Sequence, residues 1–294
     1  MPAPSYDRAV LECVPNVSEG RHRRVVDELA RACGRSLLDV HPDPDHHRSV
    51  FTLAGPGPRD CVPAVHGLAR SVARLVDLRL HDGAHPRLGA LDVVPFVALG
   101  EPAGVAVEAA RTTAAWLAGE LAIPVFLYGD ADPAGCDLPS LRRDAFVTRA
   151  PDLGPGTPHP TLGATAVGAR PPLAALNCWL DRDDVGLARE IARSVRARDG
   201  GLPGVRALGL RLASRERAQV SMNLTDLDAT GIETACRAVA ARAGAAGAGI
   251  DQVELVGLVP RAALAACSDE FLARTGLTDD QSLESRLARP RAAS

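Results

Sequence analysis

The chain of 294 residues is 46% hydrophobic and 23% charged, with a formal net charge of −3. This composition allows one large domain or two ordinary ones with buried cores, and the mild negative charge excludes the basic surface that binding to nucleic acid or anionic membranes needs. No uncharged apolar run reaches the about 18 residues of a membrane-spanning helix. The N-terminus lacks the charged and apolar blocks of a signal peptide, so we expect a soluble, cytoplasmic protein.

Seven cysteines are scattered along the chain without a C-x-x-C pair. An odd, unpatterned set predicts neither a disulfide framework nor a zinc site. We expect most of these cysteines to be small buried side chains. They stand at positions 13, 33, 61, 136, 178, 236 and 267.

The first half of the chain alternates apolar runs with one-sided helical patterns. The order strand, helix, strand, strand, helix, strand is that of a ferredoxin-like unit, and Ser18 is expected to cap its first helix. A further helix and strand follow, and residues 131–160 are predicted to be irregular apart from a helical turn near 139–145. The predicted strands are 9–15, 36–40, 48–54, 90–99 and 124–129, and the predicted helices are 20–33, 60–79 and 102–121.

The second half repeats the same order, with strands expected from 163–169 onward. We therefore predict an α+β fold of two ferredoxin-like βαββαβ subdomains, residues 1–170 and 171–294. Each would be a sheet with helices on one face, and the open faces would meet around a substrate groove. The predicted strands are 163–169, 172–180, 205–212, 217–224 and 252–259, and the predicted helices are 183–198, 229–246 and 260–269.

The polar stretch 81–97 carries the first candidate for chemistry. The four-residue spacing of His81 and His85 would suit a metal pair on a helix, but Gly83 and Pro86 predict a loop instead. A loop histidine before a buried strand is a candidate general acid and base. The alternative is a solvated or capping histidine without a catalytic role.

A second polar loop combines residue types that ligate divalent ions: His41, Asp43, Asp45, His46 and His47. Two prolines stiffen this loop, and no established metal-binding spacing is present. We therefore expect no metal and interpret the loop as one wall of a substrate pocket, with a carboxylate, Asp39, emerging from the preceding strand.

A third stretch is rich in glycine and proline but lacks the Lys-Ser/Thr ending of a phosphate-binding loop. Its stiff backbone would offer amides and carbonyls to a flat polar ligand, and the alternative is a plain linker. The stretch consists of Gly154, Pro155, Gly156, Thr157, Pro158, His159, Pro160, Thr161, Leu162 and Gly163.

Ordered motifs along nearly the whole chain resemble the glutamate formimidoyltransferase family. The longest are Cys-Val-Pro-Asn-Val-Ser-Glu-Gly at 13–20 and Gly-Ala-His-Pro-Arg-Leu-Gly-Ala-Leu-Asp-Val-Val-Pro-Phe at 83–96. Shorter ones are Leu-Leu-Asp-Val at 37–40, His-Arg-Ser-Val-Phe-Thr at 47–52, Val-Phe-Leu-Tyr-Gly at 125–129, Gly-Ala-Thr-Ala-Val-Gly-Ala-Arg at 163–170, Ala-Gln-Val-Ser-Met-Asn-Leu at 218–224 and Glu-Leu-Val-Gly-Leu-Val-Pro at 254–260.

The resemblance implies transfer of a formimidoyl group from N-formimidoyl-L-glutamate to N5 of tetrahydrofolate, in histidine degradation. It places the catalytic histidine at His85 and the folate-binding segment at Gly154–Gly163, and it implies a homodimer. The cyclodeaminase that animals fuse to this activity is expected on a separate protein. His47 stands where the family pattern has asparagine, and Ala84 stands where animal enzymes carry an acidic residue.

For this chemistry we expect His85 to carry protons between the two substrate nitrogens. Asp39 is expected to orient the cationic formimidoyl group, while Arg48 and Arg87 bind the glutamate carboxylates. Two alternatives stay open: folate-dependent formyl or formimidoyl transfer with another donor or acceptor amine, and a folate-binding protein without catalysis.

Overall fold

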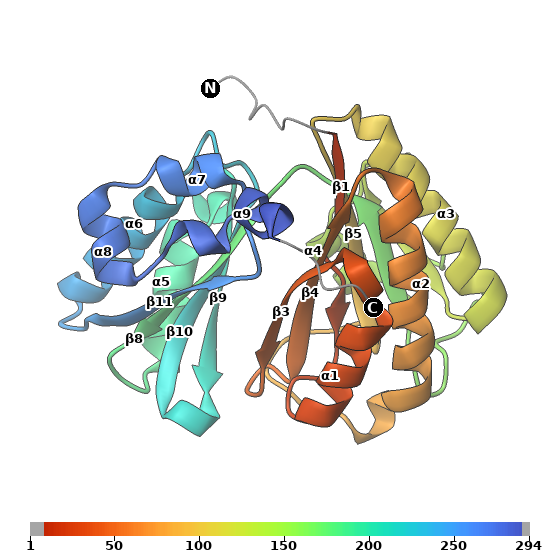
Figure 1. Ribbon diagram of the computed structural model, residues 1–294. Coiled ribbons are helices and arrows are strands. Elements are labelled where there is room, and N and C mark those ends of the chain that lie inside the picture. Colours follow the sequence, from red (N-terminus) through yellow and green to blue (C-terminus); the bar gives the residue numbers. More distant parts are fainter. Residues whose placement is uncertain (1–8, 290–294) are drawn as a thin grey trace. The chain divides into compact units, whose positions relative to one another are not determined.

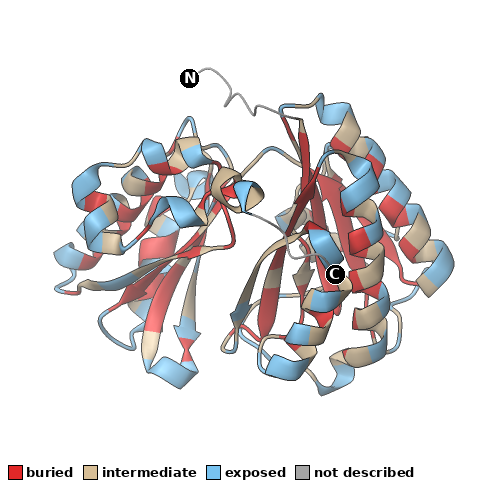
Figure 2. Cartoon of the chain, in the orientation of Figure 1, coloured by how far each residue is buried: buried red, intermediate tan, exposed pale blue. Residues whose placement is uncertain are grey.

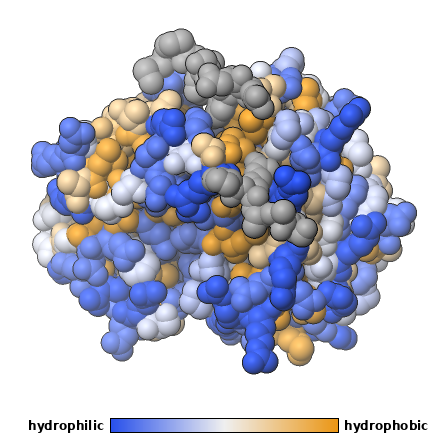
Figure 3. Space-filling view, viewed as in Figure 1, coloured by the Kyte–Doolittle hydropathy of each residue, from blue (hydrophilic) through white to orange (hydrophobic). Residues whose placement is uncertain are grey.

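The computed structural model describes residues 9–289 and divides them into two compact units, residues 9–170 and residues 171–289. Residues 1–8, where no signal peptide is expected, and the tail from residue 290 lie outside the described residues. Within the described part of the chain, no helix is long and apolar enough to cross a membrane. Hydrophilic side chains are spread over the visible surface, with smaller groups of hydrophobic ones between them (Figure 3).

The first unit is a sheet with three long helices on one face (Figure 1). Four positions of the sheet follow the ferredoxin-like order β3, β4, β1/β2, β5 with antiparallel pairing, and β1 and β2 are two pieces of one interrupted strand. The strands are β1 (Val10–Cys13), β2 (Asn16–Val17), β3 (Leu37–Asp43), β4 (Arg48–Gly55), β5 (Leu91–Leu99), β6 (Val125–Gly129) and β7 (Thr165–Ala169). The helices are α1 (Arg23–Ala32), α2 (Pro58–Leu75), α3 (Ala103–Leu121) and α4 (Leu138–Asp144), with 3-10 turns η1 (Gly34–Ser36) and η2 (Leu78–Leu80).

Two parallel pairings extend this sheet beyond β5. β7 pairs with β5 on one side and with β6 on the other. The strand expected at 163–169 therefore belongs to the first unit, inside the predicted boundary at residue 170, although the repeated strand order grouped it with the second half. An apolar run predicts that a strand exists, but it does not identify the neighbour with which the strand pairs.

Side-chain alternation divides the core of the first unit between the two faces of its sheet. Phe51 and Leu53 on β4 pack under α1, α2 and α3. Phe126 and Tyr128 on β6 point to the other face, where α4 covers them. Gly168 on β7 allows this packing, because a Cβ at that position would lie 2.5 Å from the Tyr128 ring. Figure 2 shows the buried residues concentrated on the strands and on the inner sides of the helices.

The second unit is an antiparallel sheet in the order β11, β8, β10, β9, with α5 and α6 on one face. Numbered within the unit, this is the 4-1-3-2 order of a ferredoxin-like fold, so the predicted α+β class with two such units is confirmed. The strands are β8 (Ala174–Leu180), β9 (Val205–Leu212), β10 (Arg217–Leu224) and β11 (Ile250–Val256). The helices are α5 (Val185–Val195), α6 (Ile232–Ala245), α7 (Arg261–Ala265), α8 (Asp269–Thr275) and α9 (Leu283–Ala288), with 3-10 turns η3 (Ala197–Asp199), η4 (Ala213–Arg215) and η5 (Asp279–Gln281).

All seven cysteines lie within the described residues, and each is a free thiol. Five of them are buried, which confirms the prediction that most are small core side chains.

Candidate active site

His85 lies in the first unit, on the loop between η2 and β5. The Ala84 N–H donates to the Asp45 carbonyl at 3.3 Å and fastens this loop to the β3–β4 turn. The backbone of Gly83 packs directly against the β3–β4 turn, where a Cβ at position 83 would lie 2.5 Å from the carbonyl oxygen of His46. The predicted loop conformation is confirmed, and glycine is required for the loop to lie against its neighbour.

Arg87 holds the same loop together. Its Nη2 donates to the carbonyls of His85 at 2.8 Å and of His46 at 3.2 Å, and its Nε donates to His85 at 3.2 Å. Its Nη1 lies 2.5 Å from Nδ1 of His81. Four of the five N–H donors of this guanidinium are therefore engaged within the protein. Arg87 fixes the backbone that carries His85, and binding of a substrate carboxylate by Arg87 stays a prediction.

Ser18 has a different role from the helix cap expected of it. Its Oγ donates to the carbonyl of Gly89 at 2.8 Å, which ties β2 to the end of the His85 loop. The N-cap residue of α1 is His22, whose side chain makes no capping hydrogen bond. The prediction is wrong because Asn16–Val17 continues the sheet as β2, so the helix begins later than the polar turn suggested.

The half-buried ring of His85 is held in one tautomer. Its Nδ1 lies 2.7 Å from the carbonyl oxygen of Pro86, so Nδ1–H donates and Nε2 carries the lone pair of the neutral ring. Burial lowers the pKa of His85 well below its ordinary value, and the positive charges of Arg48 and Arg142 lower it further against the opposing effect of Asp92. At neutral pH, Nε2 of His85 is therefore a proton acceptor.

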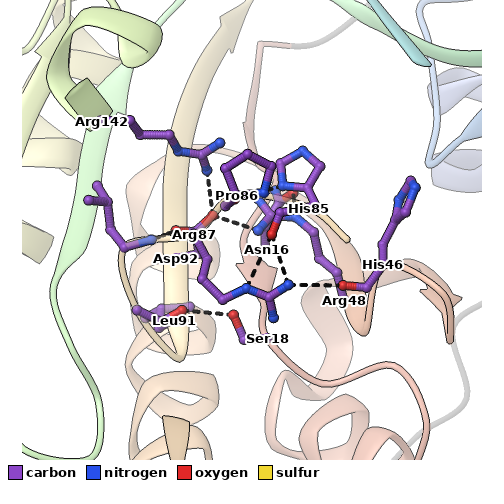
Figure 4. Close-up of polar contacts among 12 residues, drawn as sticks. Asn16, Ser18, His46, Arg48, His85, Pro86, Arg87, Leu91, Asp92 and Arg142 are labelled. Atoms are coloured by element: carbon purple, nitrogen blue, oxygen red, sulfur yellow. Dashed lines mark hydrogen bonds and ion pairs between the residues drawn. The ribbon is translucent and has the colours of Figure 1, made fainter. Parts of the chain in front are cut away.

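A buried ion-pair cluster lies beside His85 (Figure 4). The carboxylate of Asp92, which has no exposed surface, accepts from Nη1 of Arg48 and from Nη2 of Arg142, each at 2.5 Å. The Leu88 N–H donates to its other oxygen at 2.6 Å, and Nε of Arg48 donates to Oδ1 of Asn16 at 3.0 Å. The cluster joins β2, β4, β5 and α4.

Two opposing effects act on the charge of Asp92. Burial alone raises the pKa of this carboxyl, but the guanidiniums of Arg48 and Arg142 together with the Leu88 N–H outweigh burial and bring the pKa below its ordinary value. Asp92 is therefore ionised at neutral pH. One carboxylate faces two guanidiniums, so the cluster carries excess positive charge next to His85.

A β-bulge directs Asp92 to this cluster. Across the β2–β5 pair, Asn16 lies opposite Val93 and Val17 lies opposite Leu91, so Asp92 is the extra residue between them. Bulges re-aim side chains in this way and are common beside active sites.

Asp92 and Arg142 were not among the residues singled out from the sequence. The sequence does contain a signal for Asp92: it is the one charged residue within the apolar run 91–99, and a charge in a buried strand needs a partner. No sequence signal marks Arg142 as a site residue, because it belongs to a stretch that looked largely irregular.

Asp39 and Arg48 share the sheet face opposite α1, α2 and α3. Asp39 on β3 lies opposite Thr52 on β4. Arg48 lies further along β4, opposite Asp43 of β3. At about 3.3 Å per residue, the four residue steps from Arg48 to Thr52 separate the two positions by about 13 Å. The structure brings Arg48 to His85, while Asp39 lies further along the same face.

The predicted folate-binding segment reaches the His85 loop at its C-terminal end. The Ala90 N–H donates to the Leu162 carbonyl at 2.9 Å, and the Ala164 N–H donates to the Leu88 carbonyl at 3.0 Å. Residues 154–158, at the other end of the segment, are exposed. The two stretches singled out from the sequence are therefore neighbours in one unit, in contact at the buried end of the segment, while its exposed end lies away from that contact.

His159 gives this segment a fixed shape. Its backbone N–H and carbonyl pair with those of Gly163 at 2.8 and 2.9 Å, and its Nδ1 accepts from the Thr161 and Leu162 N–H groups at 3.3 and 3.1 Å. The segment closes as a tight turn that is braced by its own histidine, which a plain linker would not need.

One group of side chains among residues 9–289 has the composition and closeness of a metal site: Glu19, His22 and His47. Of the five candidate ligand residues noted in the 41–47 loop, only His47 belongs to this group. Glu19 and His22 come from the preceding connection.

Comparison with known proteins gives two adjacent family matches. Residues 10–170 match the formiminotransferase domain, N-terminal subdomain, and residues 175–288 match the formiminotransferase domain.

Individual relatives align over most of the chain. The glutamate formimidoyltransferase of Streptococcus pyogenes serotype M1 is 36% identical over 90% of this chain and 93% of its own length. The glutamate formimidoyltransferase of Thermoplasma acidophilum is 35% identical over 95% of this chain and 97% of its own length. The formimidoyltransferase-cyclodeaminase of Sus scrofa is 38% identical over 87% of this chain but 51% of its own length.

Proposed function

Because this chain belongs to the formiminotransferase family, we propose that it is a glutamate formimidoyltransferase. It moves the formimidoyl group from N-formimidoyl-L-glutamate to N5 of tetrahydrofolate and releases L-glutamate and 5-formimidoyltetrahydrofolate. The observation that carries the proposal is the state of His85, a neutral base with its lone pair on Nε2, on a loop that contacts the segment proposed for folate.

The transfer needs a group that accepts one proton in the first step and returns it in the second. N5 attacks the amidine carbon, a bond forms between them, and Nε2 of His85 takes the proton that N5 loses. The tetrahedral carbon then expels the glutamate nitrogen, and His85 returns the proton to that nitrogen as the bond breaks. Proton transfer of this kind is typically worth about 10² to 10⁴ in rate. The lowered pKa of His85 favours the first step, in which the ring must be neutral.

The charged cluster supplies groups for the donor's carboxylates. Arg48 has five N–H donors, and its bonds to Asp92 and Asn16 use two of them. We assign Arg48 to a glutamate carboxylate and assign Arg87 mainly to positioning of the His85 loop. Asp39 is kept as the carboxylate that orients the cationic formimidoyl group, since it points to the same sheet face as Arg48.

We assign tetrahydrofolate, as a co-substrate, to the segment Gly154–Gly163. Residues 154–158 are exposed and stiffened by proline, and the other end of the segment is fixed to the His85 loop by the bond from the Ala90 N–H to the Leu162 carbonyl. We further propose that the reaction serves histidine degradation in the cytoplasm and that the protein is a homodimer, which light scattering coupled to size exclusion tests.

Product analysis after incubation with both substrates tests the activity directly. Mass spectrometry is expected to find glutamate and 5-formimidoyltetrahydrofolate in equal amounts. Formation of product only from a formyl donor, or only with another acceptor amine, would replace the proposal with the alternative folate-dependent transfer. Binding of folate with no turnover of any donor would indicate a folate-binding protein.

A histidine substitution tests the base. His85→Asn should lower kcat by about 10² to 10⁴ and leave tetrahydrofolate affinity within a few-fold, because the ring acts on protons and does not hold the pterin. His66→Asn is the matched control, since His66 stacks on Trp116 on the helix side of the unit and should leave kcat unchanged. Turnover near wild type in His85→Asn would refute the assignment.

A further inference from the structure

Two connections next to the His85 loop bring together a carboxylate and two imidazoles to which the proposed transfer assigns no role. Glu19 and His22 lie between β2 and α1, and His47 lies in the β3–β4 turn. Glu19 and His47 are buried, whereas the His22 side chain is 70% exposed. The group therefore has a fixed inner side and an outer side that is open to solvent.

The ligand atoms are close enough to share one ion. Nδ1 of His22 lies 2.9 Å from Oε2 of Glu19, Nδ1 of His47 lies 3.6 Å from Oε1, and all the ligand atoms fall within 4.8 Å of one another. Ligands that share a tetrahedral zinc ion at about 2.0–2.2 Å lie roughly 3.3–3.6 Å apart. The widest separation, up to 4.8 Å, has to shorten when an ion binds, and the exposed His22 is the side chain with room to move.

The two inner ligands are held in place by contacts of their own. Oε1 of Glu19 accepts from the Arg21 and His22 N–H groups at 2.8 and 2.9 Å. The ring of His47 stacks on that of His81, with centroids 4.0 Å apart. Fixed orientation by outer contacts of this kind is typical of metal-binding residues.

The backbone at His47 is also unusual. It has φ of +48°, a left-handed conformation that is uncommon for residues other than glycine and costs conformational energy. Nδ1 of His47 accepts from the Gly20 N–H at 3.2 Å, so this atom carries a lone pair directed toward the loop of Glu19. A metal ion would replace this long hydrogen bond.

We propose that Glu19, His22 and His47 form a binding site for one divalent transition-metal ion, with zinc as the ion that fits best. Two imidazole nitrogens and one carboxylate suit zinc, cobalt, nickel or copper, whereas calcium and magnesium prefer all-oxygen sets. The exposed side of His22 leaves room for water as a further ligand. The nearby guanidinium of Arg21 is paired with Asp82 at 2.7 Å, which offsets its repulsion of a cation.

Calorimetric titration of the chelator-treated full chain with zinc chloride tests the site. Wild type should bind one zinc ion per chain. His22→Ala and His47→Asn should each weaken binding by about 100-fold or more, since loss of a direct ligand exceeds the 10–100-fold effect of an outer contact. Asparagine tolerates the positive φ at position 47, so that variant keeps its backbone. His66→Ala, a histidine variant on α2, should bind zinc within two-fold of wild type.

Cobalt gives a second readout that does not depend on activity. Visible absorption of the Co²⁺-loaded protein should show the bands of a low-coordinate site in wild type and lose them in His22→Ala, whose exposed side chain can be removed without loss of the fold. Absence of saturable 1:1 zinc binding in wild type, or wild-type affinity in both ligand variants, would overturn the proposal. The measurement reports metal binding alone, so its result is independent of the proposed transferase activity.

Discussion

Replacement of Asp92 by asparagine tests whether the buried ion-pair cluster supports the fold of the first unit. The variant keeps the size of the side chain and removes its charge. The side chains of Arg48 and Arg142, which both contact this carboxylate at 2.5 Å, are then left without a counter-charge in a buried setting. Removal of one partner from a buried ion pair costs about 3–5 kcal/mol. This loss is a large part of the roughly 5–15 kcal/mol that stabilises an ordinary domain.

Urea unfolding, followed by tryptophan fluorescence, measures the loss of unfolding free energy in the first unit. Trp116 lies in the first unit and Trp179 in the second, so a Trp179→Phe background reports the first unit alone. Asp27→Asn is the matched control in the same unit, because Asp27 pairs with Arg23 on the exposed surface of α1 and should leave the free energy of unfolding unchanged. A loss below about 1 kcal/mol in Asp92→Asn, the size of a surface pair, would refute the reasoning.

The pH dependence of the same experiment gives an independent test. The pKa of Asp92 is lower in the folded chain than its ordinary value of 3.8, so its charge stabilises the fold above that value. This stabilisation is lost as the pH falls through the lower, folded pKa. The difference between wild type and Asp92→Asn should therefore be constant from about pH 8 to pH 5 and shrink in more acidic solution. A difference that persists unchanged at the acid end would show that the carboxylate charge is not its source.

Three further predictions concern the same unit. The acid limb of kcat/KM, which reports His85 in the free enzyme, should lie below pH 6.5 and move upward in Arg142→Met, where one positive neighbour is gone; a limb that does not move would contradict the electrostatic account. Gly168→Ala should lower the free energy of unfolding by about 1–3 kcal/mol, because its Cβ would overlap the Tyr128 ring, and wild-type stability in denaturant titration would argue against that packing. Arg87→Lys should lower kcat by about 10–100-fold through displacement of the loop, whereas an unchanged kcat with a raised KM for the donor would make Arg87 a substrate clamp.

Periodicity located most elements because their burial is regular. The strands at 205–212 and 217–224 were predicted with the bounds that the structure shows, and these two strands form one antiparallel pair. The His85 loop followed from glycine and proline alone. In each case the signal is local, so a short window of sequence contains it.

The remaining features depend on contacts between distant residues. Ser18 looks like a helix cap within its own segment, yet its partner is the carbonyl of Gly89, 71 residues away. Asp92 and Arg142 meet across 50 residues, through a bulge that no local pattern encodes. Long-range pairing decided these roles, and it also placed β7 in the first sheet.

The insertion of β7 between β5 and β6 has a consequence during synthesis. β6 leaves the ribosome well before β7, which is the strand that pairs with it in the described structure. A nascent chain of which residues 1–150 have left the ribosome therefore carries an apolar strand with unpaired backbone, a state that is prone to aggregation. Because Gly154–Gly163 immediately precedes β7 and bonds to the His85 loop through the Leu162 carbonyl, we expect the proposed folate turn to become fixed when β7 completes the first sheet.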